Sequence, residues 1–222
     1  MRYIITILIL SICLPLTAQN SCSPYYPSQE GKTMVIYQYD KREKLSTISE
    51  FTITDKTANT RKFSMVLKDE DGKEIVSGKF EVTCREGETI LEPKALMSPG
   101  LLEQYENMEY SVTGNGLVFP ATLEVGQELE DGDIEMKVDA GLMNMKINVT
   151  MTDRKVERKE TVTTPAGTFD CYVITYTNTL KMGMAKTQYS TQWIAEGIGM
   201  VKEETRKSNG RLITRSILHE VR

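Results

Sequence analysis

Residues 161–207 constrain the fold of this chain more than any other stretch. Three runs of strand-favouring residues are separated by turn signals at Pro165, Ala166 and Gly167, by a Met/Gly segment at 181–185, and by residues 196–199. Short glycine-containing loops join antiparallel neighbours, because a parallel crossover needs a much longer connection. The stretch therefore predicts a meander of antiparallel strands.

Alternation of apolar and polar residues extends this prediction to most of the chain. It is clearest at residues 143–151, where every second side chain is apolar, as expected for a strand with one face in a core and one in water. About eleven or twelve such strands, without alternating helices, indicate an all-β antiparallel fold. So many strands need protected edges, which favours a barrel or a strongly curved sheet, with a β-sandwich as the alternative.

One short helix is also expected, between residues 98 and 106. Ser98 is a suitable N-cap, Pro99 suits the first helical position, and good helix formers follow. The helix is expected to close one end of the barrel or to cover a sheet edge, or else to act as a flap over a cavity.

The N-terminal residues 1–18 are typical of a secretory signal peptide. Arg2 precedes a short apolar run, and the small residues Thr17 and Ala18 follow it. Residues 19–222 are then one all-β domain with an extended N-terminal tail (19–32) and no expected transmembrane span, located in the periplasm or cell envelope. The alternative, lipoprotein acylation at Cys22, is disfavoured because Gln19 stands where a bulky apolar residue is expected.

Three cysteines follow the predicted cleavage site: Cys22, Cys84 and Cys171. Export to an oxidising compartment favours one disulfide, and the sequence leaves its pairing open, with buried inert thiols as the alternative. A catalytic thiol is disfavoured, because the only histidine that could activate it is His219.

The charge pattern and the missing motifs argue against several functions. The chain carries 27 basic and 31 acidic residues, interspersed rather than gathered in a basic stripe, so we do not expect nucleic-acid binding. No nucleophile elbow, metal-ligand cluster or phosphate loop is present, so we predict no catalytic residue, no metal, no cofactor and no enzyme activity. A hydrolase built on carboxylates such as Asp131, Asp133 and Glu135 is the alternative.

Methionine pairs suggest two kinds of ligand. Met-x-Met at 143–145 and 182–184 places two thioethers on one strand face, a pattern that suits Cu(I), but no His or Cys supplements it. A barrel interior lined by Met143, Met145, Tyr189 and Trp193 would instead be a solid core or enclose a lipid or other apolar molecule. The competing hypothesis is an envelope structural or protein-interaction module acting through its surface.

Two motifs carry a family resemblance. P-A-G-T-F-D-C-Y at 165–172 and W-I-A-E-G-I-G-M-V-K at 193–202 resemble the C-terminal half of a family of exported proteins of unknown function from Gram-negative bacteria. Weaker matches are C-S-P-Y-Y-P at 22–27 with a nearby glycine and E-V-T-C-R-E-G at 81–87. The resemblance implies an all-β, barrel-like envelope domain without established activity, and no functional residues carry over.

Overall fold

The computed structural model describes residues 22–27, 29–97, 105, 108–139 and 144–222. The expected signal peptide, all of the expected helix except Tyr105, and Met143 lie outside these residues. Within them, the one helical element is the short 3-10 helix η1 (Pro93–Leu96). No helix in the described part of the chain is both long and apolar enough to span a bilayer.

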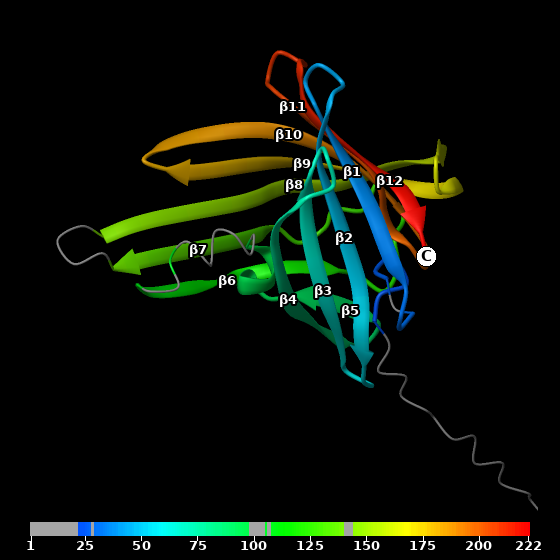
Figure 1. Ribbon diagram of the computed structural model, residues 1–222, viewed down its shortest axis with the longest axis horizontal. Coiled ribbons are helices and arrows are strands. Elements are labelled where there is room, and N and C mark those ends of the chain that lie inside the picture. The colour runs from blue at the N-terminus through cyan, green and yellow to red at the C-terminus, as the bar shows by residue number, and fades with distance from the viewer. Residues whose placement is uncertain (1–21, 28, 98–104, 106–107, 140–143) are drawn as a thin grey trace, which may run out of the picture.

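The described strands form one closed antiparallel barrel (Figure 1). Each strand pairs with its neighbour in sequence, and the last returns to the first, which confirms the predicted barrel over the sandwich. The strands are β1 (Thr33–Asp40), β2 (Leu45–Lys56), β3 (Thr60–Asp69), β4 (Glu74–Arg85), β5 (Glu88–Leu91), β6 (Glu109–Phe119), β7 (Gly132–Asp139), β8 (Asn144–Thr164), β9 (Gly167–Met182), β10 (Met184–Ala195), β11 (Gly199–Arg206) and β12 (Leu212–Val221).

Local chemistry explains the tight turns. Between β3 and β4, the carboxylate of Asp69 accepts hydrogen bonds from the backbone N–H groups of Asp71 (3.1 Å) and Lys73 (2.8 Å), and Gly72 takes a φ of +82°. The barrel closes where Thr33 and Arg222 exchange two backbone hydrogen bonds of 2.6 and 3.0 Å. A closed sheet leaves no unpaired edge for another strand to join.

The long strands β8 and β9 bend the sheet. Their pairing shifts register between Thr152 and Lys155 and again between Val156 and Arg158, as β-bulges do. On the neighbouring β7, the predicted alternation is present, with Ile134, Met136 and Val138 buried.

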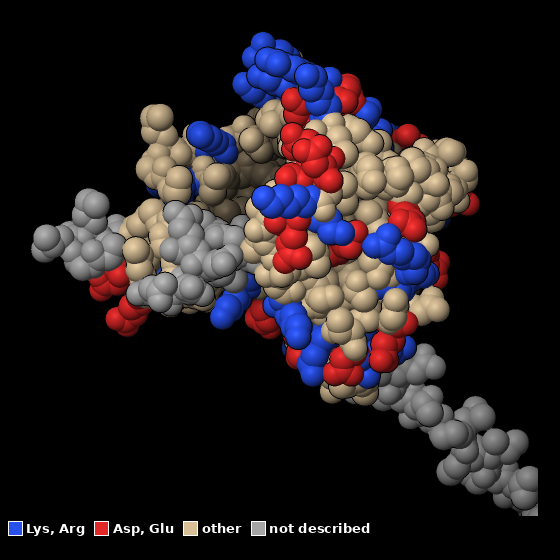
Figure 2. All heavy atoms as spheres, viewed as in Figure 1, with Lys and Arg blue, Asp and Glu red and all other residues tan. Residues whose placement is uncertain are grey.

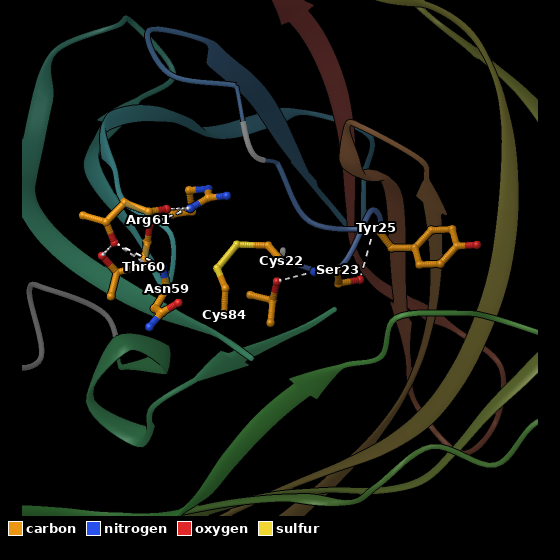
Figure 3. The surroundings of a disulfide bond; sticks show 9 residues. Cys22, Ser23, Tyr25, Asn59, Thr60, Arg61 and Cys84 are labelled. Atoms are coloured by element: carbon orange, nitrogen blue, oxygen red, sulfur yellow. Dashed lines mark hydrogen bonds between the residues drawn. A yellow bond between two sulfur atoms is a disulfide. The ribbon is translucent and has the colours of Figure 1, made fainter. Parts of the chain in front are cut away.

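Residues 22–27, which we call the N-terminal plug, pack into one end of the barrel (Figure 3). A disulfide joins Cys22 to Cys84 near the end of β4, and Cys171 is left as a buried free thiol. The N–H of Ser23 donates to Thr89 Oγ1 (3.0 Å), its hydroxyl donates to the carbonyl of Pro120 (2.6 Å), and its Oγ accepts a hydrogen bond from the N–H of Tyr25 (3.2 Å). The plug is therefore tied to β4, to β5 and to the segment after β6.

Candidate functional site: the barrel interior

A cavity of about 400 Å³ in the barrel is bordered on one side by the N-terminal plug. Its size is within the range of small-molecule sites in proteins. Tyr25, Tyr26 and Pro27 of the plug line it, and the other lining residues are mostly apolar: Met34, Ile36, Phe51, Phe63, Phe80, Leu91, Leu96, Leu117, Phe119, Met151, Ile174, Ile194, Ile198 and Met200.

Aromatic rings form much of the apolar wall. Phe63 and Phe80 stack with their centroids 4.9 Å apart, and Phe51 meets Phe80 edge to face at 6.4 Å. Tyr26 packs against Phe63 at 5.5 Å and Phe119 at 5.3 Å, and burial raises its pKa above the ordinary value, so the phenol stays neutral. The plug thus supplies an uncharged aromatic floor.

A second space of about 520 Å³ continues the first. The two share seven lining residues, among them Ile36, Phe51 and Met200, so they form one interior. Lys79 and Lys94 also line the second space, and both are exposed. The interior therefore reaches solvent on this side.

A row of polar side chains crosses the interior wall, which we call the polar belt. The strand registers pair Gln192 with Glu203, Glu203 with Ser216, Ser216 with Gln38, and Gln38 with Thr47. Directly paired residues lie on the same face of a sheet, and all five line one of the two interior spaces. The belt runs across five neighbouring strands, from β10 to β2.

Glu203 is the only carboxyl in the belt. Its Oε2 accepts hydrogen bonds from the hydroxyl of Tyr176 (2.9 Å) and the amide of Gln192 (2.8 Å), while Oε1 receives none from the described residues. Burial raises the pKa of Glu203, and this effect exceeds the lowering by the two hydrogen bonds. The pKa of Tyr176 is raised by burial and by the neighbouring Glu203.

Arg154 places a positive charge in the cavity wall and is only 5% exposed. Its guanidinium donates to the carbonyl of Val118 (3.3 and 3.4 Å) and to that of Glu130. Desolvation lowers its pKa, and no ion pair within the described residues includes it. Arg154 therefore holds the 118–130 connection to β8 with hydrogen bonds to main-chain oxygen.

The comparisons with known proteins agree with the fold. A match to the DUF3108-like family covers residues 29–218. The chain belongs to this family. No curated protein matches it at a significant level.

Two solved structures resemble this DUF3108-like chain closely in shape. A candidate lipoprotein from Parabacteroides distasonis ATCC 8503 has a TM-score of 0.73 at 21% identity, covering 91% of this chain and 100% of that one. An exported-protein candidate with a YmcC-like fold from Bacteroides fragilis NCTC 9343 has a TM-score of 0.69 at 21% identity, covering 89% and 98%. At this identity they show a shared fold alone.

Of the residues predicted to line the interior, the three that the structure describes, Met145, Tyr189 and Trp193, line neither interior space. In the DUF3108-like barrel, Gln192 and Ile194 face the cavity, so the alternate residue Trp193 lies on the other face of β10. There Trp193 packs with Val173 and Val201, and the ammonium of Lys202 lies 4.3 Å from its ring centroid.

The other predicted lining residues are elsewhere too. Tyr189, 47% exposed, is on the same side of β10 as Trp193. Met145 packs in a separate cluster on β8, where its sulfur accepts a hydrogen bond from Tyr105 at 3.7 Å, and Met143 is outside the described residues. Alternation identified two faces for each strand but gave no way to tell which face turns inward.

The three carboxylates considered for a hydrolase, Asp131, Asp133 and Glu135, line neither interior space. Glu135 accepts hydrogen bonds from Lys137, Lys146 and Asn148, which lower its pKa to about 2. Asp133 accepts a backbone hydrogen bond from Asn115 at 3.2 Å. Glu135 is thus an ion-paired carboxylate, without the raised pKa that a general acid needs.

Proposed function

We propose that this DUF3108-like protein is an exported, non-catalytic envelope protein that binds a lipid or other apolar molecule inside its barrel. One observation carries the proposal: a cavity of about 400 Å³ with aromatic and aliphatic walls continues into a second space that reaches solvent. Sites of this size with mostly apolar walls and a few polar groups are typical of small-molecule binding.

The disulfide supports the proposed compartment. Structural disulfides persist in oxidising environments such as the periplasm, as expected for a chain exported by its signal peptide. The sulfur of Cys22 is bonded to that of Cys84, so it has no valence left for a lipid thioether. We therefore infer that the folded protein is not anchored through Cys22.

Binding of N-phenyl-1-naphthylamine, an uncharged dye that brightens in apolar surroundings, tests the proposal. Ile36 lines both spaces, so Ile36→Trp fills the interior, and we expect it to weaken dye binding by at least about tenfold. Tyr37, the next residue, stacks on His219 (centroids 3.9 Å apart) and lines neither space, so Tyr37→Trp is the matched control. An unchanged affinity in Ile36→Trp, or no dye binding and no co-purified lipid in the native protein, would contradict the proposal.

A second candidate function, acting through the surface, is favoured by the hairpin of β9 and β10. This hairpin projects from the barrel (Figure 1), and near its tip Leu180, Met182 and Met184 are 41%, 56% and 83% exposed. The sequence from 171 to 195 contains Lys181 and Lys186 but no acidic residue, in a chain of net charge −4. Figure 2 shows a group of basic side chains at the top of the view, and acidic and basic side chains together over the middle and lower part of the molecule.

Exposed apolar side chains beside lysines suit the surface of an anionic membrane. The test is co-sedimentation with phosphatidylglycerol vesicles, with phosphatidylcholine vesicles for comparison. We expect binding to the anionic vesicles only, and its loss in the double variant M182S/M184S. Equal sedimentation of the native protein and the double variant would exclude this role.

A further inference from the structure

We propose that the ligand is an amphiphile whose polar head is uncharged and carries hydroxyl or amide groups, held by the polar belt, with its hydrocarbon chain in the apolar cavity. This inference rests on the proposed function and specifies the ligand class for the same site. It starts from the belt, because an interior built only for hydrocarbon has no use for polar groups in its wall.

The belt offers both donors and acceptors to a neutral head. Gln192 and Gln38 carry amides, Thr47 and Ser216 carry hydroxyls, and Glu203 presents Oε1 without a partner among the described residues. The hydroxyl of Thr47 already donates to Gln38 at 3.2 Å, whereas the side-chain hydroxyl of Ser216 makes no hydrogen bond with the described residues. Hydroxyl and amide groups, which both donate and accept, match this set.

The polar and apolar lining residues occupy different positions along the strands. On β1, the side chains that follow Gln38 toward the plug on the same face are Ile36 and Met34, and on β10 the residue that follows Gln192 is Ile194. The interior is therefore polar at the belt and apolar between the belt and the plug. A ligand with one polar end and one hydrocarbon end fits with its chain toward the plug.

A free carboxylate head is disfavoured at this place. The belt includes a carboxyl and no cation. Electrostatic repulsion from Glu203 and the loss of hydration would both disfavour binding of a second carboxylate beside it. The buried cation in the wall, Arg154, already donates to the carbonyls of Val118 and Glu130. Lys79 and Lys94 are exposed, where solvent weakens their attraction for an anion.

Displacement of N-phenyl-1-naphthylamine by three ligands of equal chain length tests the ligand class. The ligands are 1-monododecanoylglycerol, dodecanamide and dodecanoate, each below its micelle concentration at pH 8. We expect the glycerol ester and the amide to displace the dye at concentrations at least about tenfold lower than dodecanoate. The difference in displacing concentration between dodecanoate and the two neutral ligands should become smaller at pH 5, where protonation removes charge from the carboxyl groups of dodecanoate and of the protein.

Variants of the belt identify the group responsible. Glu203→Gln removes the charge and keeps hydrogen-bonding atoms, so dodecanoate should approach the amide in affinity. The matched control is Glu204→Gln, because Glu204 lines neither space and pairs with Lys202 and Arg206, each at 2.7 Å. Ser216→Ala removes a hydroxyl that makes no hydrogen bond with the described residues. This variant should lower the affinity for the glycerol ester several-fold and leave the affinity for the dye unchanged.

The outcomes separate the two proposals. If the native protein binds the dye but dodecanoate displaces it as well as or better than the glycerol ester, the ligand class is wrong while an apolar site stands. If Glu203→Gln and Glu204→Gln have the same ligand preference, and Ser216→Ala has no effect, the belt does not hold the head. If the native protein binds neither dye nor ligand, the proposed function itself fails.

Discussion

Removing the disulfide between Cys22 and Cys84 gives the most quantitative test of the fold. The bridge closes a loop with a sequence separation of 62 residues. Loop closure of that length lowers the entropy of the unfolded chain by about 14 cal/mol/K, which corresponds to about 4 kcal/mol at 25 °C. We expect the double variant C22A/C84A to lose about that much unfolding free energy, and its Tm to fall by about 8 to 16 °C.

Urea unfolding followed by circular dichroism measures this loss directly. A reductant should lower the unfolding free energy of the native protein to near that of the double variant, and it should leave the unfolding free energy of the double variant unchanged. Cys171→Ala is the control, because Cys171 is a buried free thiol and its loss changes packing without changing chain connectivity. A free energy of unfolding for C22A/C84A within about 1 kcal/mol of the native value would refute the loop-closure reasoning.

Three further predictions follow from single residues. Gly199 has a φ of +85°, and a Cβ there would lie 2.9 Å from Cδ of Pro27, so Gly199→Ala should cost about 2 to 4 kcal/mol in urea unfolding from backbone strain and overlap. Burial raises the pKa of Glu203, so the folded protein holds this proton more tightly than the unfolded chain. The Glu203 carboxyl therefore destabilises the fold increasingly as pH rises above about 4. Thermal scans should show that the stability of Glu203→Gln increases relative to the native protein from pH 4 to pH 8. The intact mass of the mature protein should show Cys22 in a disulfide and no added lipid.

The first two of these predictions have a matched control, and a specific outcome would contradict the third. Gly126 has a φ of +90° and open space at its Cβ position, so Gly126→Ala should be destabilised by backbone strain alone. An equal loss of unfolding free energy in Gly126→Ala and Gly199→Ala would refute a role for the Pro27 contact. Glu204→Gln should lack the rising trend, because ion pairs with Lys202 and Arg206 help to lower the pKa of Glu204. A diacylglycerol mass on Cys22 in the folded protein would contradict the disulfide.

Much of the fold could be predicted from the sequence, because strand alternation and turn chemistry are local. The period-two pattern at Ile134, Met136 and Val138 matches the buried face of β7, and the turn at Gly72 joins β3 to β4 as its Asp-Gly pair indicates. The number of strands favours protected edges, and the sequence left a barrel and a sandwich as two ways to protect them; the pairing of β1 with β12 decides for the barrel.

The face of each strand that lines the cavity could not be predicted in the same way. Both faces of β10 carry buried residues, Ile194 on the cavity side and Trp193 on the other, so hydrophobicity alone does not identify the inside. The register also shifts against β11 between these two residues. The polar belt is likewise invisible in sequence, because its five members lie on five strands and become neighbours only through the registers.

The sequence motifs that carry the family resemblance meet in space at the N-terminal plug. The N–H of Gly197 donates to the carbonyl of Pro24 at 2.7 Å, Tyr25 packs edge to face on Tyr172 at 5.5 Å, and Cys84 holds Cys22. These contacts join the first described residues to segments far along the chain, so no local pattern could reveal them. Since the plug forms the floor of the cavity, we infer that these contacts fix the depth of the cavity and so link the motifs to the site proposed for a ligand.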